Sequence, residues 1–145
     1  MDISIKQTPF TVALYGFSGI AVNKEYGRMG MQLMDRMWKE VKQRNIKNKG
    51  INCWVYLPNH EVFTGVELEG PPPAESDLEH RVVTLEKYAY YKHIGPYHLL
   101  AQVYAGIRNE ISARGLTISS PGMEIYGHWH ADESKLETEI LIAVG

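Results

Sequence analysis

The sequence contains a single cysteine, Cys53, in 145 residues. One cysteine cannot form an internal disulfide, so a disulfide-stabilised secreted scaffold is excluded. No apolar run approaches the roughly 18 residues of a membrane span. The first residues, MDISIKQTPF, lack the basic and apolar regions of a signal peptide. We therefore expect a cytoplasmic protein that does not enter a membrane.

An excess of charge of one sign is also absent. The chain has 15 Lys and Arg against 17 Asp and Glu, a formal net charge of -2. This balance argues against direct binding of nucleic acid, which needs a basic surface. Hydrophobic residues make up 44% and charged residues 22%, as in ordinary globular proteins. The length suits a single domain over residues 1–145 with a sizeable core.

Several catalytic and cofactor motifs are missing. The sequence has no Gly-x-Ser-x-Gly elbow, no phosphate-binding loop and no dinucleotide-binding fingerprint. His128 and His130 alternate within YGHWH (126–130), but they lack the further converging ligands that a metal site requires. Cys53, between Asn52 and Trp54, is typical of a packed thiol. We expect neither a cofactor nor a metal.

A degenerate internal repeat organises the chain. ALYGFSG (13–19) and AYYKHIG (89–95) share Ala-x-Tyr-x-x-x-Gly at an offset of 89 − 13 = 76. EVKQRNI (40–46) and EISARGL (110–116) are alike at an offset of 110 − 40 = 70, which also relates Tyr56 to Tyr126. VFTGVEL (62–68) corresponds to TEILIAV (138–144), again at 76. Such units cannot bury their apolar faces alone, so two of them should pack about a pseudo-two-fold axis.

Each repeat predicts the order β-α-β-β. Repeat one spans about 8–68, with strands near 10–17, 51–57 and 61–68 and a helix over 24–45. Repeat two spans about 82–145, with strands at 82–93, 122–129 and 137–144 and a helix over 97–113. The Pro-rich segment 69–77, EGPPPAESD, is the linker. The predicted fold is α+β: an antiparallel sheet with two helices and a central ligand cleft between the repeats.

The last predicted strand carries a carboxylate among apolar residues. In LETEILIAVG (136–145), Glu137 and Glu139 share one strand face with Leu141 and Ala143. Glu139 is either solvated at the sheet surface or held in a pocket. Nine tyrosines and three tryptophans in the chain could surround such an acid. Aromatic rings around a carboxylate form a site for flat, cationic or amphiphilic organic molecules.

Three segments of the second repeat resemble the GyrI-like small-molecule-binding domains: KYAYYKHIGPYHLL (87–100), MEIYGHW (123–129) and LETEILIAV (136–144). Domains of this family also serve as effector-binding domains of multidrug-responsive MerR- and AraC-type regulators. FTVALYGFSG (10–19) through CWVY (53–56) fits the pattern more loosely. The resemblance implies that Glu139 is the cleft acid, with Glu137 as its solvated neighbour. It also implies cleft walls formed by Tyr126, Tyr91, Trp54 and Tyr15. Two departures are the absence of a proline near Ala143 and the segment GHWH in place of an Asn-Pro-like turn.

Three functions are compatible with these residues. The resemblance favours a stand-alone protein that captures or senses hydrophobic or cationic organic ligands. Some relatives hydrolyse cyclopropane-bearing xenobiotics, so Glu139 could instead be a general base with Tyr126 polarising the substrate. The family's namesake modulates DNA gyrase, which implies a third, protein-interaction role. The sequence leaves a homodimer open.

Overall fold

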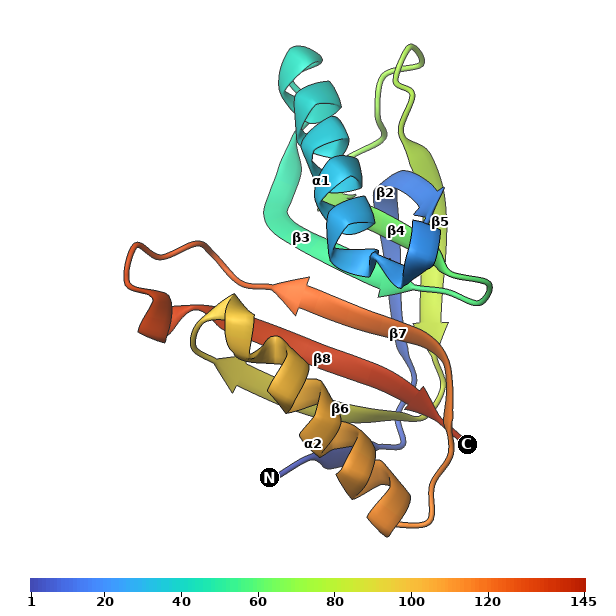
Figure 1. The fold of residues 1–145 in the computed structure, drawn as a ribbon. Coiled ribbons are helices and arrows are strands. Elements are labelled where there is room, and N and C mark those ends of the chain that lie inside the picture. Colours follow the sequence, from blue (N-terminus) through green and yellow to red (C-terminus); the bar gives the residue numbers. More distant parts are fainter.

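The computed structural model describes residues 1–145 and contains one eight-stranded sheet with two α-helices (Figure 1). The helices are α1 (Tyr26–Gln43) and α2 (Leu100–Ala113), each preceded by a short 3-10 turn. The strands are β1 (Ser4–Lys6), β2 (Phe10–Ile20), β3 (Asn48–Tyr56), β4 (Glu61–Leu68), β5 (Glu79–Leu85), β6 (Tyr88–Ile94), β7 (Ile118–Tyr126) and β8 (Glu137–Val144). They pair antiparallel in the order β1-β6-β8-β7-β3-β4-β2-β5. The α+β class and the two β-α-β-β repeats are confirmed.

The single strand predicted over 82–93 is wrong. The chain breaks at Glu86 and Lys87 and forms two strands that lie in different halves of the sheet. Strand β5 pairs with β2 at the edge of the first half, whereas β6 pairs with β8 in the second. The predicted strand over 122–129 is also shifted, because β7 runs from Ile118 to Tyr126 and leaves GHWH in a loop. An unbroken apolar alternation does not reveal where a strand crosses from one half to the other.

The sheet register shows where the pseudo-two-fold axis passes. Trp54 of β3 and Glu124 of β7 correspond at an offset of 124 − 54 = 70, and they are direct cross-strand partners. A pair of equivalent residues can face each other only on the axis itself. The irregularities at Asn48/Asn52 in β3 and Ile118/Gly122 in β7 lie at the same offset. The repeat therefore extends to the backbone, and its centre is the Trp54–Glu124 pair.

One alignment within the repeat needs correction. The partner of Val66 in the second repeat is Ile142, at an offset of 142 − 66 = 76, as predicted for β4 and β8. Val66 pairs with Tyr15, whereas Ile142 pairs with Ala89. Tyr15 therefore corresponds to Ala89, at an offset of 74, and not to Tyr91. The Ala-x-Tyr-x-x-x-Gly match is two residues out of register.

Both helices cover the same face of the sheet, α1 over the first half and α2 over the second (Figure 1). Their buried residues occupy equivalent positions: Leu33, Met37 and Val41 in α1, and Val103, Ile107 and Ile111 in α2. This is the periodicity of an amphipathic helix that buries one side. The last helical residues, Gln43 and Ala113, lie two positions before Asn45 and Gly115, which are equivalent residues and adopt the left-handed conformation with φ of 50° and 72°.

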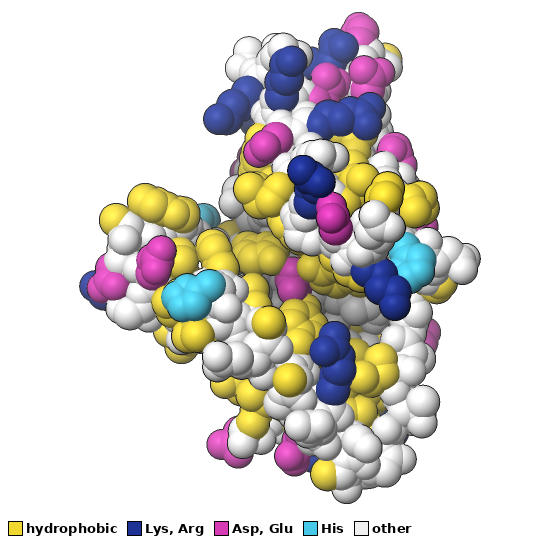
Figure 2. Space-filling model, viewed as in Figure 1, with side chains coloured by type: hydrophobic (Ala, Val, Ile, Leu, Met, Phe, Trp, Pro, Cys, Tyr) yellow, Lys and Arg dark blue, Asp and Glu magenta, His cyan; other side chains and the backbone are white.

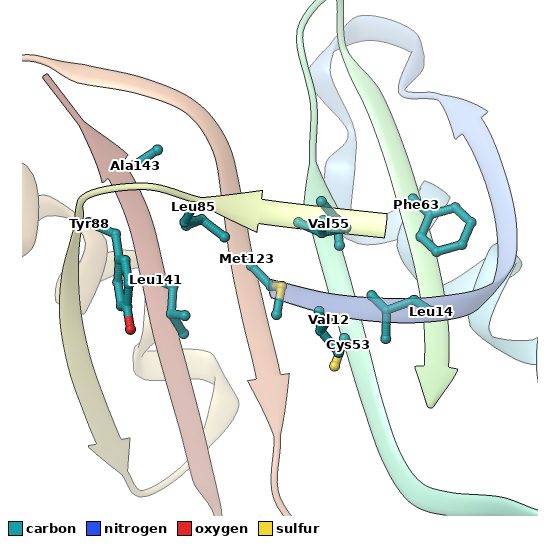
Figure 3. Packing of buried hydrophobic residues seen from close by; sticks show 11 residues of the cluster. Val12, Leu14, Cys53, Val55, Phe63, Leu85, Tyr88, Met123, Leu141 and Ala143 are labelled. Carbon is teal, nitrogen blue, oxygen red and sulfur yellow. The ribbon is translucent and has the colours of Figure 1, made fainter. Parts of the chain in front are cut away.

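On the other face of the sheet, the apolar side chains pack against one another and not against a helix. Residues from β2, β3, β4, β5, β6, β7 and β8 form one apolar cluster there, including Leu14, Val55, Phe63, Leu85 and Met123 (Figure 3). The strong curl of the sheet brings β5 near β7, although these strands are not neighbours in the sheet. No helix of the structure is long and apolar enough to cross a membrane.

Candidate functional site

A carboxylate is buried at the centre of the face that carries the helices. Glu124 is only 3% exposed, and it lies on the pseudo-two-fold axis between the two halves. Figure 2 shows an acidic side chain within a hydrophobic cleft that separates the two halves of the molecule. No Lys, Arg or His lies within ion-pairing distance of Glu124. The protein thus supplies no counter-charge to this acid.

Three tyrosines, which we call the tyrosine cage, donate hydrogen bonds to Glu124. The hydroxyls of Tyr56 and Tyr126 donate to Oε1 at 2.8 and 2.6 Å. The hydroxyl of Tyr104 donates to Oε2 at 2.6 Å. Hydrogen bonds to a charged group are about twice as strong as neutral ones and offset part of the cost of burying it. The cage is what allows an unpaired carboxylate at this position.

The repeat explains how the cage is assembled. Tyr56 and Tyr126 are equivalent residues, two positions beyond Trp54 and Glu124 on adjacent strands, so their rings approach the axis from opposite sides. Tyr104 comes from α2 and has no tyrosine equivalent, because the corresponding residue of α1 is Met34. Met34 instead accepts a hydrogen bond from Asn52, at 2.9 Å from Nδ2 to sulfur. The second repeat alone therefore supplies the acid and its third donor.

The cage phenols hold their protons strongly. Burial raises the pKa of each of the three phenols far above its usual range, and the adjacent Glu124 charge raises it further. All three therefore stay donors across the physiological range. A carboxylate offers about four lone-pair sites, and the cage fills three of them.

Trp54 forms an aromatic wall next to the cage. Its ring lies edge-on to that of Tyr126, with centroids 5.6 Å apart, and the ring of Tyr97 is also edge-on to Tyr126, at 5.5 Å. The indole lies directly on Gly30 of α1, where an added Cβ would be 2.2 Å from ring atom Cζ3. Glycine is required at position 30 because the ring occupies the space of a side chain.

A cavity of about 540 Å³ opens beside the cage. Its size is that of a site for a small organic molecule. Two cage residues, Tyr56 and Tyr104, line it, together with Tyr26, Leu57, Pro58, Arg108, Ile118, Ser119, Ser120, Gly122 and Ile142. A ligand here would contact aromatic rings from both halves. Glu124 does not itself line the cavity, but it accepts hydrogen bonds from the hydroxyls of two lining residues, Tyr56 and Tyr104.

The structure brings together only some of the residues expected from the sequence. Tyr126 belongs to the cage, and Trp54 is the cross-strand partner of Glu124. Tyr91 lies on the same face, but Ile140 of β8 separates it from Glu124, and it packs into the core beneath α2. Tyr15 is on β2, where it stacks on His80 with centroids 4.6 Å apart. None of these four expected wall residues is part of the cavity lining itself; Tyr126 and Trp54 lie next to Glu124, whereas Tyr91 and Tyr15 do not.

The two acids of the last strand lie on the opposite face of the sheet. Glu139 pairs across the ladder with Ile125, whose side chain alternates with that of Glu124. Its carboxylate accepts a hydrogen bond of 2.6 Å from Tyr90. Burial of the Tyr90 phenol raises its pKa to about 12, and the hydrogen bond to Glu139 and the Glu139 charge contribute to the same shift. Glu137 forms an exposed ion pair with Lys92. The geometry does not place either acid in the cleft.

Sequence reasoning missed Glu124, Tyr56 and Tyr104 as site residues. Two signals pointed to Glu124: it lies two residues before Tyr126 on one strand, hence on the same face, and the 70-residue offset aligns it with Trp54. Tyr56 was recognised only as the equivalent of Tyr126. His128 and His130 are exposed in a loop, and the structure contains no group of three or more His, Cys, Asp or Glu side chains that could hold a metal ion.

The GyrI-like small-molecule-binding domain matches residues 1–144, which is nearly the whole chain. The chain belongs to this family. A comparison with curated proteins finds no match. The assignment agrees with the resemblance seen in the sequence.

Solved structures share the fold of this GyrI-like protein. The EcmrR C-terminal domain is similar at a TM-score of 0.76 and 16% identity, over 99% of this chain and 97% of that one. SAV2435 bound to tetraphenylphosphonium gives a TM-score of 0.61 and 20% identity, over 100% and 94%. A hydrolase from Listeria innocua gives 0.50 and 14%, over 97% and 93%. At these identities the likeness shows the fold alone.

Proposed function

We propose that this protein captures or senses aromatic organic cations in its cleft, with Glu124 as the counter-charge and the tyrosine cage and Trp54 as the walls. The observation that carries the proposal is a nearly fully buried carboxylate with three phenol donors and no basic partner. The role of cleft acid, expected at Glu139, passes in this proposal to Glu124. In this proposal Tyr126 and Trp54 remain cleft residues because they adjoin Glu124, although they are not part of the cavity lining.

The energetics favour a cationic ligand. Burying an ionised carboxylate is costly, and the cage offsets that cost with hydrogen bonds while leaving the negative charge in place. A delocalised cation is weakly hydrated, so it loses little on leaving water and gains both this charge and the negative faces of the surrounding rings. A neutral ligand of the same shape gains only the apolar contacts. An anion is repelled by the Glu124 carboxylate.

The cavity suits a bulky aromatic ligand. Its lining combines tyrosine rings with aliphatic side chains, and its volume of about 540 Å³ lies within the usual range for small-molecule sites. SAV2435, which shares the fold, binds tetraphenylphosphonium, a lipophilic aromatic cation. That ligand is therefore a suitable probe here.

Two probes of nearly the same shape and opposite charge test the proposal. Tetraphenylphosphonium and tetraphenylborate would be titrated by calorimetry into wild type, Glu124→Gln and Glu139→Gln. We expect wild type and Glu139→Gln to prefer the cation, and Glu124→Gln to lose that preference, with at least a tenfold weaker affinity for the cation. Equal affinity of wild type for both probes would refute a site built for cations.

Capture and hydrolysis can be separated with the same protein. The cage surrounds Glu124 closely, and three of its lone-pair sites already accept phenol protons. This arrangement favours holding a ligand over activating water. An electrophilic cyclopropane substrate incubated with the protein should be recovered intact. A hydrolysis product that disappears in Glu124→Gln would instead support the hydrolase alternative.

A further inference from the structure

Arg108 is the only charged residue that lines the cavity. It lies on α2, one turn after Tyr104, and its guanidinium is 5.6 Å from the centre of the Tyr104 ring. The side chain is exposed, and it makes neither an ion pair nor a hydrogen bond with any residue of the chain. Its position is therefore set by the aromatic face beneath it, and its five N–H donors remain free for a ligand.

Two opposite charges thus meet around one tyrosine. The hydroxyl of Tyr104 binds the buried carboxylate of Glu124, while the face of the same ring carries the guanidinium of Arg108. The cationic group is at the open surface and the anionic group is buried beneath the cage. Ser119 and Ser120, which also line the cavity, add hydroxyl donors. A ligand consequently meets positive charge and hydroxyl donors on the cavity lining, whereas the negative charge lies outside that lining, on the Glu124 carboxylate bonded to the hydroxyls of Tyr56 and Tyr104.

This order of charges matters for ligand choice. A ligand with one positive charge is attracted by Glu124 but repelled by Arg108, and nothing else in the cavity lining neutralises the arginine. A ligand that also carries a carboxylate or a comparable acceptor pairs with both groups at once. Arginine binds carboxylates in a two-pronged geometry, so this second contact also fixes the orientation of the ligand.

We propose that Arg108 makes this site selective for zwitterionic aromatic ligands, which place a cationic ring system against the tyrosine cage and an anionic or strongly accepting group at the guanidinium. This inference rests on the proposed function and specifies its ligand class. Arg108 acts as a specificity-determining residue, and Glu124 remains the anchor.

Rhodamine B, a zwitterion, and its ethyl ester, a cation that lacks the free carboxylate, are a matched pair of probes. Their affinities would be measured by fluorescence anisotropy in wild type, Arg108→Gln and Arg108→Lys. Arg36→Gln is the control, because Arg36 also lies over an aromatic ring, 3.8 Å from the centre of Phe17, but outside the cavity. It removes the same charge from the other helix.

We expect wild type to prefer the zwitterion by about two- to fivefold, the range of an exposed ion pair. Arg108→Gln should abolish the preference by weakening the zwitterion and tightening the ester, and Arg108→Lys should retain most of it. Added salt should reduce the preference, since the pair is exposed. Arg36→Gln should leave both affinities unchanged.

Two results would overturn the inference in distinguishable ways. If both dyes bind wild type equally and Arg108→Gln changes neither, the selectivity is absent although the cation site stands. If neither dye binds wild type and tetraphenylphosphonium also fails to bind, the proposed function itself is refuted, and this inference with it.

Discussion

Replacement of Tyr104 by Phe should destabilise the protein more than replacement of either other cage tyrosine. Tyr104 is the only protein donor to Oε2 of Glu124, at 2.6 Å. Oε1 receives two phenols, so it keeps one when Tyr56 or Tyr126 is truncated. Because Glu124 is only 3% exposed, water cannot readily replace the lost donor. The carboxylate oxygen would be left without a protein partner.

The magnitude follows from the charge on the acceptor. A hydrogen bond to a charged group contributes about 1.5–3 kcal/mol to stability, against about 0.5–1.5 kcal/mol for a neutral pair. We expect Tyr104→Phe to cost about 2 kcal/mol, which for a chain of this length corresponds to roughly 4–8 °C in Tm. Tyr56→Phe and Tyr126→Phe should each cost less.

Urea unfolding followed by far-UV circular dichroism gives these free energies directly. Tyr97→Phe is the control, since Tyr97 packs on Tyr126 but its hydroxyl binds no residue of the chain, and its cost should stay below about 0.5 kcal/mol. A double-mutant cycle adds a second test: in a Glu124→Gln background the cost of Tyr104→Phe should fall to that of a neutral bond. The reasoning is refuted if Tyr104→Phe costs no more than Tyr97→Phe, or if Glu124→Gln leaves its cost unchanged.

Three further predictions concern protonation and packing. The pKa of each cage phenol is raised in the folded state, so these phenols stabilise the fold fully below their unfolded pKa of about 10 and lose that contribution as pH rises. The free energy of unfolding should therefore fall above about pH 10, and it should fall less steeply in Tyr→Phe variants of the cage. Absorbance at 295 nm should show that these phenols ionise only when the protein unfolds. Burial raises the pKa of Cys53 to about 12, so a disulfide reagent at pH 8 should modify it only after denaturant is added, and rapid native labelling would contradict its burial. Gly30→Ala should lower the free energy of unfolding by about 1–3 kcal/mol, because the added methyl group overpacks against Trp54, and it should shift the tryptophan fluorescence. Gly27→Ala, which has open space at its Cβ, should raise the free energy of unfolding by up to about 1 kcal/mol. Equal effects of the two variants in urea unfolding would show that the indole does not require a glycine at position 30.

The fold could be predicted largely from the sequence because each helix carries a regular apolar stripe. Leu33, Met37 and Val41 recur at helical spacing, and their equivalents in α2 do the same. The repeat also supplied the correct offsets for β3 with β7 and for β4 with β8. The pairing of β5 with β2 in the first half of the sheet could not be predicted from the sequence, because strand pairing depends on contacts between residues far apart in the chain.

The site was predicted only in part, and the reason lies in strand register. Glu124 and Glu139 both lie on strands and both carry apolar neighbours in the sequence, so alternation alone does not say which face holds the cleft. The face is fixed by the helices, which cover the side of Trp54 and Glu124. Tyr104 joins the cage through packing of α2 on the sheet, a tertiary contact that no local pattern encodes.

The most direct test of the central claim compares the two acids in one binding experiment. Tetraphenylphosphonium would be titrated by calorimetry into wild type, Glu124→Gln and Glu139→Gln, with circular dichroism confirming that all three are folded. We predict that Glu124→Gln weakens the Kd at least tenfold while Glu139→Gln leaves it within a factor of two. If Glu139→Gln abolished binding and Glu124→Gln did not, the ligand would bind on the other face of the sheet, and Glu124 would not be the cleft acid.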